Sequence, residues 1–150
     1  MLDYDKVEFD KLLSSLDVQE IKNLVHLTGY VQNLDLPAII SQSTAFLYPS
    51  LRESFGIPIL EGMACGVPVI TSNTSSMPEV AGEDAALIVD PFDSNQITQA
   101  LITLVEDNAL ANLLVEKGIE RAKNFSWEAM AKNVLELYGD VYKEIQLETA

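Results

Sequence analysis

The sequence is poor in cysteine and in positive charge. Cys65 is the only cysteine among 150 residues, which excludes an internal disulfide or a cysteine metal cluster and suits a reducing compartment. Nine Lys and Arg residues stand against 23 Asp and Glu residues, a formal net charge of −14. Because nucleic acids and anionic membranes attract cationic patches, this balance argues against either as the main partner.

Long apolar runs are also missing. Hydrophobic residues make up 48% of the chain, but they are dispersed, and no run approaches the roughly 20 residues of a membrane-spanning helix. The acidic start, Met1-Leu2-Asp3-Tyr4-Asp5-Lys6, is not followed by the apolar stretch of a secretory signal. We therefore expect one cytoplasmic domain over residues 1–150. Asp3-Tyr4-Asp5 spells a metal-binding Asp-x-Asp pattern, but no strand precedes it, and we expect no metal site there.

Short apolar runs alternate with helical patterns up to Val89. Four runs have strand length and β-branched or aromatic content: 25–28, 45–48, 67–71 and 86–89. Helical patterns separate them, at about 7–24, 36–43 and 58–65. This alternation predicts an α/β fold, a Rossmann-like open parallel sheet with helices on both faces. Because a doubly wound domain usually has about six strands, we expect an N-terminally truncated sheet, the latter part of a larger fold.

After Val89 the pattern is helical only. Asp93 and Ser94 are candidate caps for one helix, and Ser126 for the last. The last helix carries an apolar stripe from Trp127 to Ile145, with spacings of three and four residues. Such a face needs a partner surface, within the fold or on a missing domain, and an uncovered last helix or sheet edge would favour a homodimer.

The segment from Pro49 to Pro68 follows a strand and opens a helix, the place where ligands bind in open α/β sheets. Pro58 suits the first helical position, and Gly66 suits the position just past the helix end. The start of this helix offers free backbone N–H groups and a partial positive charge. It is therefore a candidate site for an anion.

Charges near this segment limit how a phosphate could bind. Residues 24–105 contain eight acidic residues and one basic residue, Arg52. A phosphate here would rely on N–H groups around Gly56 and Ile57, on Arg52, or on cations from elsewhere. Glu53 and Glu61 flank those N–H groups and could accept hydrogen bonds from hydroxyls, as a nucleotide sugar would require. Alternatively, Glu61 is present only because the helix macrodipole favours an acidic residue near the helix start, and Glu53 is a solvated loop residue.

The same segment resembles the signature of the group 1 family of retaining glycosyltransferases, which have the two-domain GT-B fold. The family's hallmark is a pair of glutamates separated by seven residues, with a small residue, Phe and Gly after the first. Glu53-Ser54-Phe55-Gly56 and Glu61 match that pattern in full. The resemblance extends from Val25–Val31 through Pro78–Gly82 to Phe125–Glu128, all within the family's nucleotide-binding second domain.

The resemblance implies metal-independent hexosyl transfer, with retention, from a UDP-, GDP- or ADP-linked sugar as substrate and without a cofactor. It implies that Glu53 binds the donor sugar at the reacting carbon and is the catalytic position, and that Glu61 binds the ribose hydroxyls. The resemblance also places Ser54, Phe55, Gly56 and Ile57 in the donor-binding segment. The backbone N–H groups of Phe55, Gly56 and Ile57 would bind sugar and phosphate oxygens. The turn that borders the nucleobase is formed by Gly29, Tyr30 and Val31.

The chain also departs from the family pattern. The Arg and Lys that such enzymes place against the diphosphate have no counterpart here, and neither does the acceptor-binding first domain. We therefore expect a partial donor-binding domain that is catalytically incomplete alone, with an unknown acceptor. The alternative is a non-catalytic nucleotide-sugar-binding module, or a subunit that a partner chain completes. A receiver-like regulator needs an Asp at the end of a central strand, where this chain has Tyr48-Pro49-Ser50.

Overall fold

The computed structural model describes the backbone of residues 3–148 and the side chains of residues 6–146. The side chains of Asp3-Tyr4-Asp5 therefore lie outside the described residues. The chain divides into two compact units, unit 1 (Met1–Pro37) and unit 2 (Ala38–Ala150), and each is described by itself. The expectation of one domain over residues 1–150 stays a prediction.

Unit 1 is mostly helical. It contains α1 (Asp3–Leu16), the 3-10 helix η1 (Gln19–Leu24) and the start of α2 (Leu36–Ile40). Asp17 has a φ of 56°, the left-handed conformation that ends a helix, so the helical pattern predicted at 7–24 is divided in two. Leu13 is buried, and Lys22 forms an ion pair with Asp10 at 2.6 Å.

The strand predicted at 25–28 is wrong. Val25 has extended dihedral angles, but residues 25–28 are not assigned to a strand, and Val25 and Leu27 are exposed. His26 is exposed too. A strand requires a neighbouring backbone to complete its hydrogen-bond ladder, and no segment among residues 3–148 pairs with this one.

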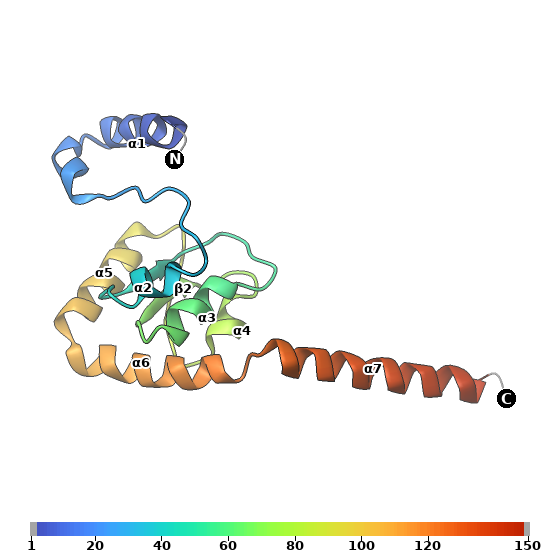
Figure 1. Cartoon of the computed structure of the whole chain (residues 1–150). Helices are drawn as coiled ribbons and strands as arrows, with labels where there is room; N and C mark the ends of the chain where they lie inside the picture. The colour runs from blue at the N-terminus through green and yellow to red at the C-terminus, as the bar shows by residue number, and fades with distance from the viewer. Residues whose placement is uncertain (1–2, 149–150) are drawn as a thin grey trace. The chain divides into compact units, whose positions relative to one another are not determined.

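Unit 2 contains a three-stranded parallel sheet, in the order β1 (Phe46–Tyr48), β2 (Val69–Ser72), β3 (Leu87–Val89). Helices α3 (Ile57–Ala64) and α4 (Met77–Ala81) connect the strands. Three further helices complete the unit, α5 (Ser94–Glu106), α6 (Asn108–Lys123) and α7 (Trp127–Glu148) (Figure 1). From β1 onward, the predicted alternation of strands and helices, followed by helices only, is confirmed.

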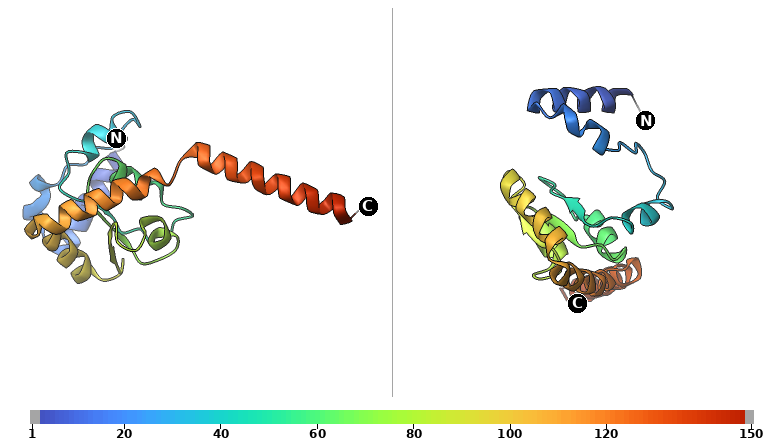
Figure 2. Two further views of the ribbon diagram at one scale, coloured as in Figure 1. Left: turned by 90° about the horizontal axis from the view of Figure 1, so that it is seen from below. Right: turned by 90° about the vertical axis from the view of Figure 1, so that its left-hand side faces the viewer.

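The sheet is covered on both faces because successive residues of a strand point to opposite sides. Val69 of β2 packs in a buried cluster with Ile59 and Met63 of α3. The next residue, Ile70, packs in a second cluster with Leu104 of α5 and Leu114 of α6. Figure 2 shows α3 and α5 on opposite faces of the sheet. This confirms the open parallel sheet with helices on both faces.

Helix α3 lies close to the sheet at Gly62. A Cβ atom there would lie 2.8 Å from Cδ1 of Phe46 and 3.1 Å from Cγ2 of Val69. Only glycine fits this approach without a shift of the neighbouring atoms. The predicted end of α3 is confirmed, since Gly66 has a φ of 71° and directly follows the C-cap residue Cys65.

Of the candidate caps of the later helices, Asp93 and Ser126 are confirmed, whereas Ser94 is the first residue of α5. The side chain of Asp93 accepts the backbone N–H groups of Asn95 and Gln96 at 3.0 and 3.1 Å, and Ser126 accepts that of Ala129 at 3.0 Å. The large apolar side chains of α7 are exposed in the structure: Trp127, Met130, Val134, Tyr138, Val141, Tyr142 and Ile145. No helix within residues 3–148 has both the length and the apolar character to cross a bilayer.

Candidate functional site

The segment that the sequence singles out lies at one edge of the sheet. Loop 49–56 leaves the carboxyl end of β1 and enters α3, and loop 73–76 leaves the carboxyl end of β2 and enters α4. Since β1 and β2 are parallel, with Tyr48 opposite Thr71, both loops begin at the same edge. Helix α3 begins at Ile57, one residue before the predicted start, and Pro58 lies in its first turn.

Loop 49–56 has no regular structure, but side-chain hydroxyls hold its backbone. Five side-chain hydroxyl groups donate hydrogen bonds of 2.5–3.2 Å to backbone carbonyls. Thr71 bonds to the carbonyl of Tyr48, Ser72 to that of Ser50, Thr74 to that of Leu51, Ser75 to that of Glu53 and Ser76 to that of Phe55. We call these five residues the hydroxyl row. Ser75 has a φ of 56°, which is a strained conformation for a residue with a side chain. In this conformation the Ser75 hydroxyl donates to the Glu53 carbonyl at 2.6 Å.

These bonds also determine where the N–H groups point. A trans peptide places its C=O and N–H on opposite sides. Because the Phe55 carbonyl is directed at Ser76, the N–H of Gly56 points away from the hydroxyl row. The Gly56 carbonyl accepts the N–H of Ile59 at 3.0 Å, which turns the N–H of Ile57 away from the helix. Within the described residues, no acceptor pairs with the N–H of Phe55, Gly56 or Ile57.

The conformation at Gly56 requires glycine. Its φ is 102°, and a Cβ atom there would lie 3.1 Å from Cδ1 of Ile59. This turn places three unpaired N–H groups at the N-terminus of α3, where the helix carries its partial positive charge. The arrangement favours an anionic or hydroxyl-bearing ligand.

The side chain of Phe55 is in contact with Phe125, which lies just past the C-terminal end of α6. Its ring meets the ring of Phe125 edge to face, with centroids 5.8 Å apart. The guanidinium of Arg121 lies 4.8 Å from the Phe125 centroid and donates to the carbonyls of Glu79 and Val80 at 2.6 and 3.1 Å. No spacing in the sequence predicted this contact, although Phe125 stands in one of the blocks that carry the family resemblance.

Two hydroxyl groups hold the carboxylate of Glu53. The side chain is half-buried, and its Oε1 accepts hydrogen bonds from Tyr48 Oη at 2.5 Å and from Ser50 Oγ at 3.0 Å. The pKa of Tyr48 is raised to about 12. The largest cause is its hydrogen bond to Glu53, followed by burial and by the charges of Glu53 and Glu61. Since the Glu61 charge reaches Tyr48, both glutamates act on the same end of the sheet. Sequence reasoning missed Tyr48, although its place as the last residue of a strand could have indicated it.

The remaining predicted residues fall in two places. Glu61, Ser54 and Arg52 are exposed in unit 2, Glu61 on α3 and the other two in loop 49–56. Gly29, Tyr30 and Val31 belong to unit 1, where Gly29 turns with a φ of 65° and Tyr30 is 85% exposed. The structure therefore brings Glu53, Glu61 and the N–H groups of loop 49–56 together, and the nucleobase role of residues 29–31 stays a prediction.

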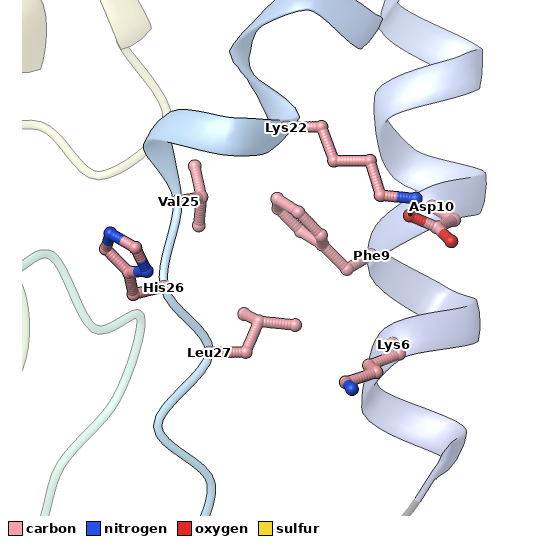
Figure 3. Close-up of a pocket in the computed structure, with 7 residues that line it drawn as sticks. All are labelled: Lys6, Phe9, Asp10, Lys22, Val25, His26 and Leu27. Atoms are coloured by element: carbon pink, nitrogen blue, oxygen red, sulfur yellow. Dashed lines mark ion pairs between the residues drawn. The ribbon is translucent and has the colours of Figure 1, made fainter.

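Unit 1 also contains a pocket of its own (Figure 3). Its volume is about 430 Å³, and it is lined by Lys6, Phe9, Asp10, Lys22, Val25, His26 and Leu27. Lys22 and Asp10 are both about half exposed, so their ion pair adds little stability. The pocket contains none of the predicted site residues. The described part of the chain also holds no cluster of three His, Cys, Asp or Glu side chains able to bind a metal ion.

Curated proteins similar to this chain include mannosyltransferases and other glycosyltransferases. The family model described as "Glycosyl transferases group 1" matches residues 5–121. The O-antigen chain mannosyltransferase B of Escherichia coli is 40% identical over 114 residues, which are 76% of this chain and 30% of that protein. This chain therefore spans less than a third of that relative's length.

Several solved structures have a similar fold, among them the following two. Sucrose-phosphate synthase from Thermosynechococcus elongatus has a TM-score of 0.80 and 28% identity, over 94% of this chain and 35% of that one. The HepE protein of Anabaena, solved in complex with UDP and glucose, has a TM-score of 0.79 over 92% of this chain and 37% of that one. At 21% identity, the second likeness shows the fold alone.

Proposed function

Because this chain belongs to the group 1 family of glycosyltransferases, we propose that it is the donor-binding part of a retaining hexosyltransferase that uses a nucleotide-activated sugar. The observation that carries the proposal is the arrangement at the carboxyl ends of β1 and β2. Three unpaired N–H groups at the start of α3 lie between two glutamates, one in the loop and one on the helix. That combination suits a ligand with both phosphate oxygens and hydroxyl groups.

Each group has a proposed role in donor binding. The N–H groups of Phe55, Gly56 and Ile57 would bind phosphate and sugar oxygens, helped by the partial positive charge of the α3 N-terminus. The exposed carboxylate of Glu61 would accept hydrogen bonds from the ribose hydroxyls. Glu53 would accept one from the donor sugar and set its position at the reacting carbon.

Catalysis would rest on positioning and electrostatics. With retention, the acceptor hydroxyl approaches the face of the sugar from which the nucleoside diphosphate departs, so donor and acceptor must be held together. The proposal assigns the leaving-group charge to N–H groups, to Arg52 and to cations outside this chain rather than to a metal. It includes no cofactor besides the donor, and it places residues 29–31 beside the nucleobase.

The rest of the proposal concerns the partners of this chain. An acceptor-binding domain or a partner chain would supply the acceptor site, since this chain spans 30% of the length of the mannosyltransferase it matches. The exposed apolar face of α7 favours a second candidate, a donor-binding subunit completed by another chain. In both cases we propose the cytoplasm as its location, because its only cysteine suits a reducing compartment.

Saturation-transfer NMR of the purified chain with UDP-glucose, GDP-mannose and ADP-glucose tests the proposal. We expect saturation of one nucleotide, its loss in Glu61→Ala, and its retention in Glu79→Ala, an exposed glutamate on α4 that serves as the matched control. Equal saturation in Glu61→Ala would overturn the ribose assignment. Absence of saturation for all three would contradict donor binding by this chain.

A further inference from the structure

We propose that Tyr48 and Ser50 are positioning residues that hold the Glu53 carboxylate in one orientation, so that its Oε2 is free to accept a hydroxyl of the donor sugar. The inference rests on the proposed function, because it assigns the sugar to Glu53. It adds two residues that neither the glutamate pair nor the family pattern identified.

The geometry places both donors on one oxygen. Tyr48 Oη lies 2.5 Å from Glu53 Oε1, and Ser50 Oγ lies 3.0 Å from the same atom. Within the described residues, Oε2 has no hydrogen-bond partner. A carboxylate held through one oxygen by two donors has lost most of its rotational freedom, while the other oxygen keeps its acceptor sites.

The two donors are themselves fixed. The Tyr48 carbonyl accepts the hydroxyl of Thr71 at 2.9 Å, and the Tyr48 ring stacks on Phe46 with centroids 6.3 Å apart. The Ser50 carbonyl accepts the hydroxyl of the fully buried Ser72 at 2.5 Å. The orientation of Glu53 is therefore transmitted from the strands of the sheet.

This arrangement lowers the cost of binding. A carboxylate that must stop rotating when the sugar arrives loses conformational entropy at that moment, whereas a carboxylate already fixed does not. Since the pKa of Tyr48 is about 12, its phenol stays protonated and donates throughout the neutral range. The position of the sugar would then be set before it binds, as a reaction that depends on placement requires.

The first measurement tests the contact without any ligand. In a chain labelled with ¹³Cζ-tyrosine, we expect Glu53→Ala to move the Tyr48 resonance at neutral pH and to lower the Tyr48 pKa from about 12 towards 10.0. Tyr48→Phe assigns the resonance, and the exposed Tyr138 is the internal control, whose signal should not move. An unchanged Tyr48 resonance and pKa would overturn the inference whatever the chain binds.

The second measurement separates the sugar from the nucleotide. We define the sugar contribution as the Kd of the nucleoside diphosphate divided by the Kd of the nucleotide sugar, for the base that the wild-type chain binds. Tyr48→Phe and Ser50→Ala should each lower this ratio about tenfold and leave the Kd of the nucleoside diphosphate unchanged, since hydrogen bonds to charged groups are strong. Ser50→Thr keeps the hydroxyl and should restore the ratio, and Tyr138→Phe should not change it.

The outcomes are distinct. A ratio equal to wild type in Tyr48→Phe and Ser50→Ala would overturn the positioning role and leave the proposed function intact. Equal weakening of both ligands would indicate a general structural effect and would also overturn it. If the wild-type chain binds neither ligand, the proposed function is contradicted, and this inference with it.

Discussion

Loop 49–56 and segment 25–31 both lack regular structure. The family resemblance implies a donor-binding role for the loop and, in the other segment, for residues 29–31 beside the nucleobase. In the loop, hydroxyls of the neighbouring strand and loop hold one carbonyl after another, and Phe55 is anchored on Phe125. In segment 25–31, the Thr28 hydroxyl bonds only to the carbonyl of the adjacent Gly29, and Tyr30 is 85% exposed. The difference is that the backbone of the loop is hydrogen-bonded by side chains of other segments, whereas the Thr28 hydroxyl bonds only within its own segment.

The largest loss of stability should come from disturbing the close packing of α3 on the sheet, since loop 49–56 leads into this helix. Gly62→Ala places a Cβ atom 2.8 Å from the Phe46 ring, and we expect it to lower the free energy of unfolding by about 3 kcal/mol. Urea unfolding followed by circular dichroism measures this. The control is Gly139→Ala on α7, where nothing lies within 4 Å of the added Cβ. It should be neutral or slightly stabilising, and an equal loss at both glycines would contradict the close approach of α3.

Each of the two segments contains a glycine with a positive φ, so the same substitution can be made in both and the losses of stability compared. Gly56→Ala must adopt a φ of 102° and approach Ile59 at 3.1 Å, so we expect a loss of about 2 kcal/mol in the free energy of unfolding. Gly29→Ala, with a φ of 65° in an exposed segment, should lose about 1 kcal/mol. Thermal and urea unfolding of both variants provide the measurement. A greater loss at Gly29 would reverse the comparison.

Removing single hydroxyls should have a smaller effect. Ser72→Ala leaves the Ser50 carbonyl without its shortest partner in a buried position and should cost about 1 kcal/mol. Amide hydrogen exchange should also become faster in loop 49–56. Thr28→Ala removes an exposed hydroxyl and should stay within about 0.5 kcal/mol of wild type. If both variants are equally stable, the hydroxyl row does not hold the loop.

The last effect appears only at alkaline pH and is absent at neutral pH. Folding raises the pKa of Tyr48 from 10.0 to about 12, so above pH 10.0 the unfolded chain releases a proton that the folded chain retains. The stability from this protonated phenol is complete below pH 10.0 and is lost as the pH rises to about 12. Urea unfolding of wild type and Tyr48→Phe across this range should show a steeper fall in the free energy of unfolding for wild type. Parallel curves would contradict the raised pKa.

Local signals in the sequence were sufficient for the elements of unit 2. Asp93 and Ser126 mark helix starts because a cap acts on N–H groups two or three residues away. Gly66 marks a helix end for an equally local reason, its positive φ. The carboxylate of Glu53 could also be placed near the start of α3 from spacing alone, because few residues separate them.

What the sequence could not supply depends on pairing between distant segments. The strand predicted at 25–28 had the composition of a strand, but a strand forms only where another backbone pairs with it. The run of hydroxyl residues from Thr71 to Ser76 is visible in the sequence. Which carbonyls it meets depends on the register that sets Tyr48 opposite Thr71. Tyr48 and Ser50 lie only five and three residues before Glu53. They were missed because the path that turns the Glu53 carboxylate back toward them depends on the carbonyls that the hydroxyl row holds.

The hydroxyl row has a consequence for how this site can diverge. Its five residues bind backbone carbonyl oxygens, which every amino acid has. These hydrogen bonds therefore do not depend on which side chains loop 49–56 carries. Exposed positions such as Arg52 and Ser54 can therefore be exchanged while the path of the backbone is retained. A library that randomises those two positions should yield mostly folded proteins with altered ligand preference, which makes the loop a suitable starting point for engineering.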